Sequence, residues 1–192
     1  MKADVGKVIR NILKDIQVDL KDEFDQNFER EAFFSEAWQR RRSPIRPDRN
    51  ILVDSGTLRR SITSRTTEKS VVFSSSLPYS GIHNNGGEIV VTAKMKHFFW
   101  GKYREASGTF ERKKDGSLRK TKKNACLESE ADFWKVLALM HVGKAIRIPR
   151  RRFLGAAPEV ERIVREIIEE NLREYFGSAD FRNNFDFKIK NT

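Results

Sequence analysis

Two long amphipathic segments, one near each end of the chain, set the strongest limit on how it can fold. Residues 4–30 and 158–176 both carry apolar side chains at spacings of three and four, which is the period of one helix face. The first stripe runs from Val5 to Phe28, and the second from Val160 to Phe176. Because an apolar stripe must be covered, each helix has to pack against a sheet or a neighbouring subunit, and we expect the chain's own sheet.

Short apolar runs between these helices predict a small antiparallel sheet. The first hairpin is expected from strands at 61–67 and 70–76, and a second strand pair at 88–92 and 145–148. Short helical turns are expected at 55–61 and 79–84, and an extended linker at 40–50, which contains two prolines. The predicted fold class is α+β, with the sheet packed by the N-terminal and C-terminal helices in one domain over 1–176, followed by a tail at 177–192.

Residues 93–143 form an insertion between two strands that we expect to pair with each other. Aromatic and apolar clusters predict short helices near 95–103 and 133–140. The stretch 107–124 between them is rich in Gly and Lys and has no apolar period, so it is predicted to be an irregular loop. Insertions of this length are unusual inside a compact domain unless they are functional.

The net charge of +11 is concentrated in the middle of the chain of 192 residues. Residues 1–38 carry −3 and residues 153–192 carry −2, whereas residues 39–152 carry +16. Residues 94–123 alone hold 11 basic and 3 acidic side chains. This run is either a solvated face or a surface that meets a polyanion or a partner. The candidate contact residues are Lys94, Lys96, Lys102, Arg112, Lys113, Lys114, Arg119, Lys120, Lys122 and Lys123.

The aromatic residues beside these cations also allow two interpretations. Phe98, Phe99, Trp100 and Tyr103 lie within a few positions of Lys94, Lys96 and Lys102. They either offer a stacking platform for nucleobases or form a small hydrophobic core under the insertion.

Composition excludes two classes of protein. The single cysteine, Cys126, excludes a disulfide framework and a zinc site built from several cysteines. No apolar run approaches the ~20 residues of a membrane-spanning helix, and residues 1–15 lack the apolar core of a signal peptide. We therefore expect neither a secreted disulfide-rich protein nor a membrane protein.

No catalytic pattern is present in the sequence. The three histidines, His83, His97 and His141, lack metal-ligand spacing, and Gly-rich turns lack the lysine of a phosphate-binding loop. Four glutamates in the C-terminal helix (Glu161, Glu166, Glu169 and Glu170) are expected to form its solvated face. We therefore expect no enzyme activity, no cofactor, no metal and no small-molecule substrate. A hydrolase with His83 as its base is the least favoured alternative.

Three short segments precede the C-terminal helix in a fixed order. They read ILVDSGTLRRSI at 51–62, PYSGIHNNGG at 78–87 and IPRRRFLG at 148–155. Together they resemble the virion morphogenesis family of Mu-like tailed bacteriophages, which is related to tail-completion proteins. The resemblance covers about 50–176 apart from the insertion. The chain departs from the family pattern with Ser55 for Thr, Ser80 for Ala, Asn84 for Gln and Arg152 for Pro.

The resemblance implies structural rather than catalytic roles for the matching residues. These are Gly56, Leu58, Ile62, Tyr79, His83, Gly86, Pro149, Arg150, Phe153, Leu154 and Gly155. It implies a non-enzymatic protein of tail completion or head–tail joining that self-associates into a ring and contacts phage neck or tail proteins. Such a protein is expected in the bacterial cytoplasm during assembly and then in the neck or tail of the virion. Transient DNA contact is compatible with this role, and a nucleic-acid-binding protein that uses the basic insertion is the alternative.

Overall fold

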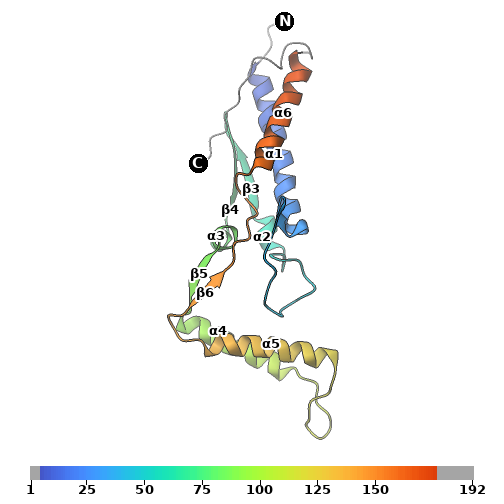
Figure 1. Cartoon of the computed structure of the whole chain (residues 1–192), viewed down its shortest axis with the longest axis vertical. Coiled ribbons are helices and arrows are strands. Elements are labelled where there is room, and N and C mark those ends of the chain that lie inside the picture. Colours follow the sequence, from blue (N-terminus) through green and yellow to red (C-terminus); the bar gives the residue numbers. More distant parts are fainter. Residues whose placement is uncertain (1–4, 177–192) are drawn as a thin grey trace. The chain divides into compact units, whose positions relative to one another are not determined.

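The computed structural model describes residues 5–176, which divide into two compact units (Figure 1). Of the described residues, the first unit combines 5–38, the segment Asn50–Asn84 and residues 151–176. The second unit combines Gln39–Arg49 with Asn85–Arg150 and therefore contains the whole insertion 93–143. The predicted tail at 177–192 lies outside the described residues.

In the first unit, the two long helices pack along each other. They are α1 (Val5–Arg30) and α6 (Pro158–Phe176), at the predicted positions. Their shared core buries Ile16, Leu20 and Phe24 of α1 together with Ile167 of α6. The two apolar stripes thus cover each other, and Phe24 also contacts the edge of the Phe73 ring on the neighbouring hairpin.

That hairpin consists of β3 (Ile62–Thr66) and β4 (Val71–Ser75), as predicted. The strands are antiparallel, with Ile62 opposite Ser75 and Thr66 opposite Val71. Val71 and Phe73 pack against the core of the two long helices, and Gln17 of α1 donates a hydrogen bond of 2.9 Å to Ser64 Oγ. The hairpin therefore presents one face to α1 and the other away from it.

Three short elements complete the first unit. The sequence did not predict β1 (Ala32–Phe33) and β2 (Glu36–Ala37), because two-residue strands are too short to show an alternating pattern. The predicted helical turns are present as α2 (Thr57–Arg60) and α3 (Ser80–Asn85). Leu58 of α2 and Ile62 of β3 enter a second buried cluster with Phe28, Trp38, Ile51 and Phe153.

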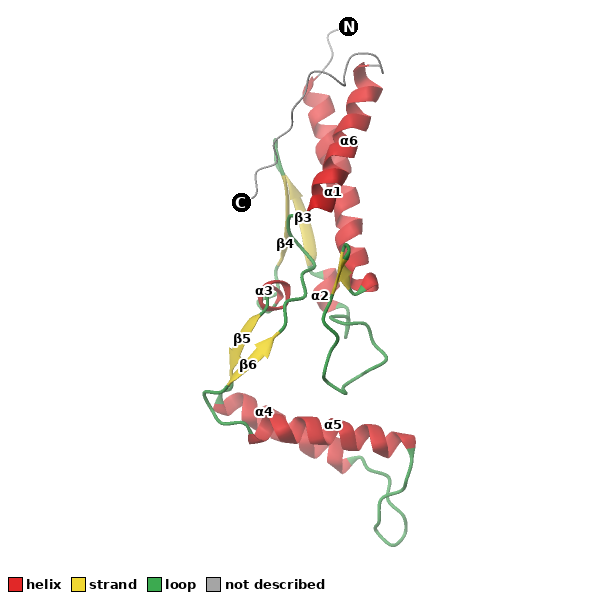
Figure 2. Cartoon of the chain, in the orientation of Figure 1, coloured by secondary structure: helices red, strands yellow, loops and turns green. Residues whose placement is uncertain are grey.

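The second unit is a strand pair that carries a helical hairpin. Strand β5 (Gly87–Val90) pairs antiparallel with β6 (Ala145–Ile148), so the insertion does lie between two paired strands. The insertion folds into α4 (Ala93–Gly108) and α5 (Lys122–Leu139), joined by residues 109–121 (Figure 2). No regular strand or helix forms over the linker 40–50, as predicted.

Both helices of the insertion are longer than the sequence analysis predicts. Thr92 and Thr121 cap their first turns through side-chain bonds to the amides of Met95 and Asn124, both at 3.2 Å. The buried contact positions include small side chains, at Ala106, Ala131 and Ala138. Because alanine gives a weak apolar signal, the periodic pattern stops short of the true helix ends.

The predicted α+β class is confirmed, although the strands within residues 5–176 form three separate two-stranded sheets and not one sheet. Among residues 5–176, none of the helices has both the length and the apolar character needed to cross a bilayer.

Candidate functional site

Two of the sequence motifs meet at Phe153 in the first unit. Asn84 Oδ1 accepts hydrogen bonds from the amides of Phe153 at 2.9 Å and Leu154 at 3.0 Å, and Asn84 Nδ2 donates to Leu154 O at 3.1 Å. The Arg151 amide donates to His83 O at 2.8 Å. One asparagine side chain therefore joins the segment before β5 to the segment after β6.

The same segment is held from its other side by two buried residues of the N-terminal region. Trp38 Nε1 donates to Arg152 O at 2.6 Å, and Asn27 Nδ2 donates to Phe153 O at 3.5 Å. Asn27 is fully buried and its Oδ1 also accepts from the Phe34 amide at 3.0 Å. The Phe153 ring lies 5.3 Å from the Phe28 ring, measured between centroids. Buried polar groups normally have hydrogen-bond partners, as these groups do. The motif segment therefore connects α1 and the segment around Trp38 through hydrogen bonds and ring packing.

Arg152 has a structural explanation although it departs from the family pattern. Its guanidinium lies 4.5 Å from the centroid of the Phe33 ring and donates to Ala156 O. A cation over an aromatic face contributes roughly 0.5–1 kcal/mol at partly exposed sites. The arginine therefore attaches the turn before α6 to β1, where the family more commonly has a proline.

The motif glycines adopt backbone conformations that suit glycine. Gly56 and Gly86 both have φ of 73°. In the second unit, a Cβ atom on Gly86 would lie 2.9 Å from the Arg150 backbone nitrogen. Neither the conformation nor the space admits a side chain there. Pro149 directly follows β6 at Ile148, and Gly155 also has a positive φ, of 136°.

His83 is half-buried beside Tyr79, with 6.1 Å between the ring centroids. Burial, and then the positive charge of Arg151, lower the pKa of His83 below its ordinary value of 6.5. Its Nδ1 atom is buried and has no hydrogen-bond partner among the described residues. A histidine that serves as a general base in a triad is oriented by a partner on the second ring nitrogen. His83 has no such orienting partner among the described residues. Within residues 5–176, no cluster of three metal-ligating side chains occurs.

The cations of the insertion gather on an ordered hairpin, which we call the basic hairpin (residues 109–121). The predicted irregular loop 107–124 is wrong at both ends, because α4 and α5 extend into it and the remainder is hydrogen-bonded. Asn124, only 2% exposed, donates to the carbonyls of Glu111 and Arg119 at 2.8 and 2.7 Å and accepts from the Glu111 amide at 2.9 Å. The predicted contact residues Arg112, Lys113, Lys114, Arg119 and Lys120 are exposed on it.

The other predicted cations lie on the helices. Lys94, Lys96 and Lys102 belong to α4, where Lys102 pairs with Glu105 at 2.7 Å. Lys122 and Lys123 open α5, and Lys123 pairs with Glu111 at 3.0 Å.

The aromatic residues of the insertion contribute mainly to packing between α4 and α5. Phe99 is 7% exposed and stacks on Trp134 with 6.0 Å between centroids. Phe98, 54% exposed, meets the same Trp134 edge-on. Trp100 and Tyr103 pair with each other at 5.6 Å. The contacts therefore favour a small core over an open stacking platform.

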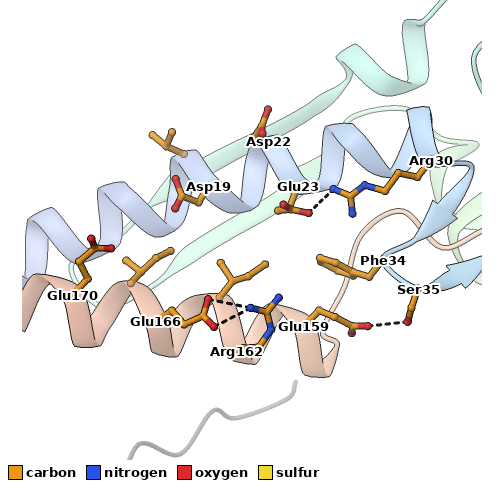
Figure 3. Close-up of a pocket in the computed structure, with 13 residues that line it drawn as sticks. Asp19, Asp22, Glu23, Arg30, Phe34, Ser35, Glu159, Arg162, Glu166 and Glu170 are labelled. Carbon is orange, nitrogen blue, oxygen red and sulfur yellow. Dashed lines mark hydrogen bonds and ion pairs between the residues drawn. The ribbon is translucent and has the colours of Figure 1, made fainter. Parts of the chain in front are cut away.

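A groove of about 900 Å³ lies between α1 and α6, and we call it the acidic groove (Figure 3). Its apolar lining consists of Val18, Phe34, Ile163 and Ile167. Around these stand six carboxylates and two arginines: Asp19, Asp22, Glu23, Glu159, Glu166, Glu170, Arg30 and Arg162.

The helical spacing predicts a solvated helix face for Glu166 and Glu170 and gives no sign of the groove. Both side chains are exposed, but α1 contributes three further carboxylates beside them. Only the packing of α1 on α6 brings these residues together. The one signal in the sequence was the net negative charge of both end segments.

A known protein family matches most of this chain. The family model described as the phage virion morphogenesis family matches residues 3–173. No curated protein and no solved structure matches the chain. The match spans most of the 192 residues and includes all three motif segments, so the chain belongs to the phage virion morphogenesis family.

Proposed function

We propose that the chain is a non-enzymatic structural protein that acts in tail completion or head–tail joining through ring-like self-association. The proposal rests on what the family-motif residues do in the structure. Phe153, Leu154 and Asn84 are engaged in holding backbone segments together, and the match covers residues 3–173. Residues with this role hold a scaffold together, and the function of a scaffold lies in the surfaces that it presents.

The strand pairs supply a physical route to self-association. Every sheet among residues 5–176 has only two strands, so each strand has one edge without a ladder partner in its sheet. An open edge can pair with a strand of another chain. In β4, Val72 is 50% exposed, which gives the β3–β4 hairpin an apolar side chain on its solvent face.

The proposed partners are further copies of the chain and phage neck or tail proteins. The proposed location is the bacterial cytoplasm during assembly and the neck or tail of the finished virion. No cofactor, metal or small-molecule substrate is part of the proposal.

The solution mass of the full chain tests self-association. Sedimentation over a wide concentration range, with electron micrographs of the sample, should show one discrete oligomer above the mass of 22.4 kDa for one chain. A strict monomer that also binds no neck or tail protein would contradict the proposal.

Nucleic-acid binding is a second candidate, supported by the ordered and exposed cations of the basic hairpin. Lysine and arginine contacts to phosphates make affinity fall by roughly 10³–10⁵ between 50 and 200 mM salt when 6–10 contacts form. Titration of duplex DNA at both salt concentrations tests this candidate. Undetectable binding at low salt would remove it.

A further inference from the structure

We propose that the acidic groove of one copy binds the basic hairpin of the next copy, which makes the subunit contact head-to-tail. This inference rests on the proposed self-association and names the two surfaces that carry it. A contact between two different patches of the same chain closes into a ring when its rotation permits closure.

The acidic groove holds negative charge that its own arginines do not neutralise. Arg30 pairs with Glu23 at 2.6 Å, and Arg162 pairs with Glu166 at 2.9 Å. Within residues 5–176, Asp22 and Glu159 accept hydrogen bonds only from neutral donors, Gln26 at 2.6 Å and Ser35 at 2.9 Å. Asp19 and Glu170 have no ion-pair partner within residues 5–176. Four carboxylates therefore remain without a cation.

The surroundings of these carboxylates favour a cationic protein segment over a free ion. Val18 is 57% exposed at the groove, and Phe34, Ile163 and Ile167 add apolar surface. A cleft lined by one sign of charge concentrates the field and raises the local concentration of the opposite charge. Apolar surface between the charges suits the methylene stems of lysine and arginine, which pack on it while their charged ends reach the rim.

The backbone of the basic hairpin is already hydrogen-bonded within the chain, so the hairpin can dock into the acidic groove as a folded element. Arg112 and Leu118 form a bridge across it, and the Lys113 amide donates to Ser117 O at 2.8 Å. Its two carboxylates are engaged locally, since Glu111 pairs with Lys123 and Asp115 accepts from Ser117 Oγ at 2.6 Å. Lys113, Lys114, Arg119 and Lys120 are exposed and have no ion-pair partner in the part of the chain that the structure describes.

The two surfaces carry opposite charges within residues 5–176. The groove has four carboxylates without a cationic partner, and the hairpin has five cations without an anionic partner, because Arg112 donates only to the Gly116 carbonyl. Because Asn124 already orders the backbone at the base of the hairpin, less backbone conformational entropy is lost on docking than for an unstructured loop. Complementary charge directs the encounter and disfavours wrong partners. The contact is therefore expected to weaken as salt is raised.

Charge reversal in the full chain tests the pairing. The groove variant is Asp19→Lys with Glu170→Lys, and the hairpin variant is Lys113→Glu with Lys114→Glu. Matched controls carry the same charge changes elsewhere on exposed residues: Glu68→Lys with Glu174→Lys, and Lys135→Glu with Lys144→Glu. Circular dichroism and thermal melting show whether each variant is folded.

Sedimentation measures the concentration at which half of the chains are assembled. We expect each test variant to raise this concentration at least about tenfold, and each control to leave it within about twofold of the wild type. A mixture of the two test variants retains one intact groove and one intact hairpin. That mixture should assemble with the two variants alternating, because the reversed hairpin of one variant also complements the reversed groove of the other. The four reversals combined in one chain should restore assembly for the same reason.

The outcomes separate this inference from the proposed function. If the wild type assembles and both test variants assemble equally well, the groove–hairpin contact is wrong while self-association stands. If the hairpin variant loses only DNA binding, the hairpin serves nucleic acid and the inference is also wrong. A wild type that stays monomeric at every concentration overturns self-association itself.

Discussion

Asn84 connects two parts of the chain that are about 70 residues apart in sequence. Its amide group satisfies the amides of Phe153 and Leu154 and the carbonyl of Leu154. The sequence showed Asn84 only as a substitute for the usual glutamine, and no local pattern reveals which backbone groups a side-chain amide will bind. By contrast, the sequence did predict the short helical turns at 55–61 and 79–84, because capping residues and glycines beside apolar runs are local signals.

The Asn84→Ala variant should lower the free energy of unfolding by about 2–4 kcal/mol. The substitution leaves the amides of Phe153 and Leu154 without their acceptor in a region where Phe153 is 1% exposed. Urea unfolding followed by tryptophan fluorescence measures the change. Asn50→Ala, at an exposed position, is the control and should stay within about 0.5 kcal/mol of the wild type. An equal loss of unfolding free energy in both variants would show that the Asn84 hydrogen bonds do not stabilise this part of the fold.

His83 should make the fold less stable in mild acid. Its pKa is lowered in the folded chain, so the unfolded chain takes up the proton first as the pH falls through 6.5. The free energy of unfolding therefore falls below about pH 6.5 until the folded-state pKa is reached, and the full contribution is present above pH 6.5.

Unfolding titrations between pH 5 and 7.5 test the His83 contribution. The His83→Asn variant should show a shallower pH dependence in this window. His141→Asn, at an exposed position, should keep the wild-type dependence. If the free energy of unfolding of His83→Asn depends on pH as steeply as that of the wild type, His83 is not shielded from protonation in the folded chain.

At the scale of elements, strong periodicity decided what could be predicted. Both long helices and the β3–β4 hairpin follow from apolar spacing, because their stripes are continuous. The extents of α4 and α5 did not follow, since alanines form much of their contact. The sequence predicts an irregular loop in place of the basic hairpin, because the buried Asn124, which lies outside residues 109–121, orders it. No pattern within residues 109–121 signals this order.

The Asn124→Ala variant should loosen the basic hairpin without unfolding the unit. The substitution removes three hydrogen bonds that join the two ends of residues 109–121. Amide hydrogen exchange over 109–121 should accelerate by at least about tenfold, while exchange in the middle of α4 changes little. Ser129→Ala, on an exposed face of α5, serves as the control. Unchanged protection in Asn124→Ala would mean that other contacts order the hairpin.

The Ile167→Ala variant should weaken the contact between α1 and α6. Ile167 is 7% exposed in the core that it shares with Ile16, Leu20 and Phe24, so truncation should cost about 2–4 kcal/mol. Val18→Ala, at a side chain that is 57% exposed, should change the free energy of unfolding by no more than about 0.5 kcal/mol. Chemical denaturation compares the two, and a small loss for Ile167→Ala would contradict the packing described here.

In the whole molecule, the net charge of +11 is a sum over separate acidic and basic surfaces. The scaffold of the first unit carries an acidic groove, and the second unit carries an ordered basic hairpin. The sequence revealed this division as a sum of charges over segments. It could not reveal the groove, because residues from α1 and α6 that lie 129 to 152 positions apart become neighbours only after folding.

Completion of virions in vitro tests whether the chain acts in tail completion or head–tail joining. A lysate of phage mutants that lack this chain is supplemented with the purified full chain, and infectious particles are counted beside electron micrographs. The account predicts that separate heads and unfinished tails accumulate without the chain, and that adding it restores joined, infectious particles. Complete and infectious virions in the unsupplemented lysate would contradict a structural role in tail completion or head–tail joining.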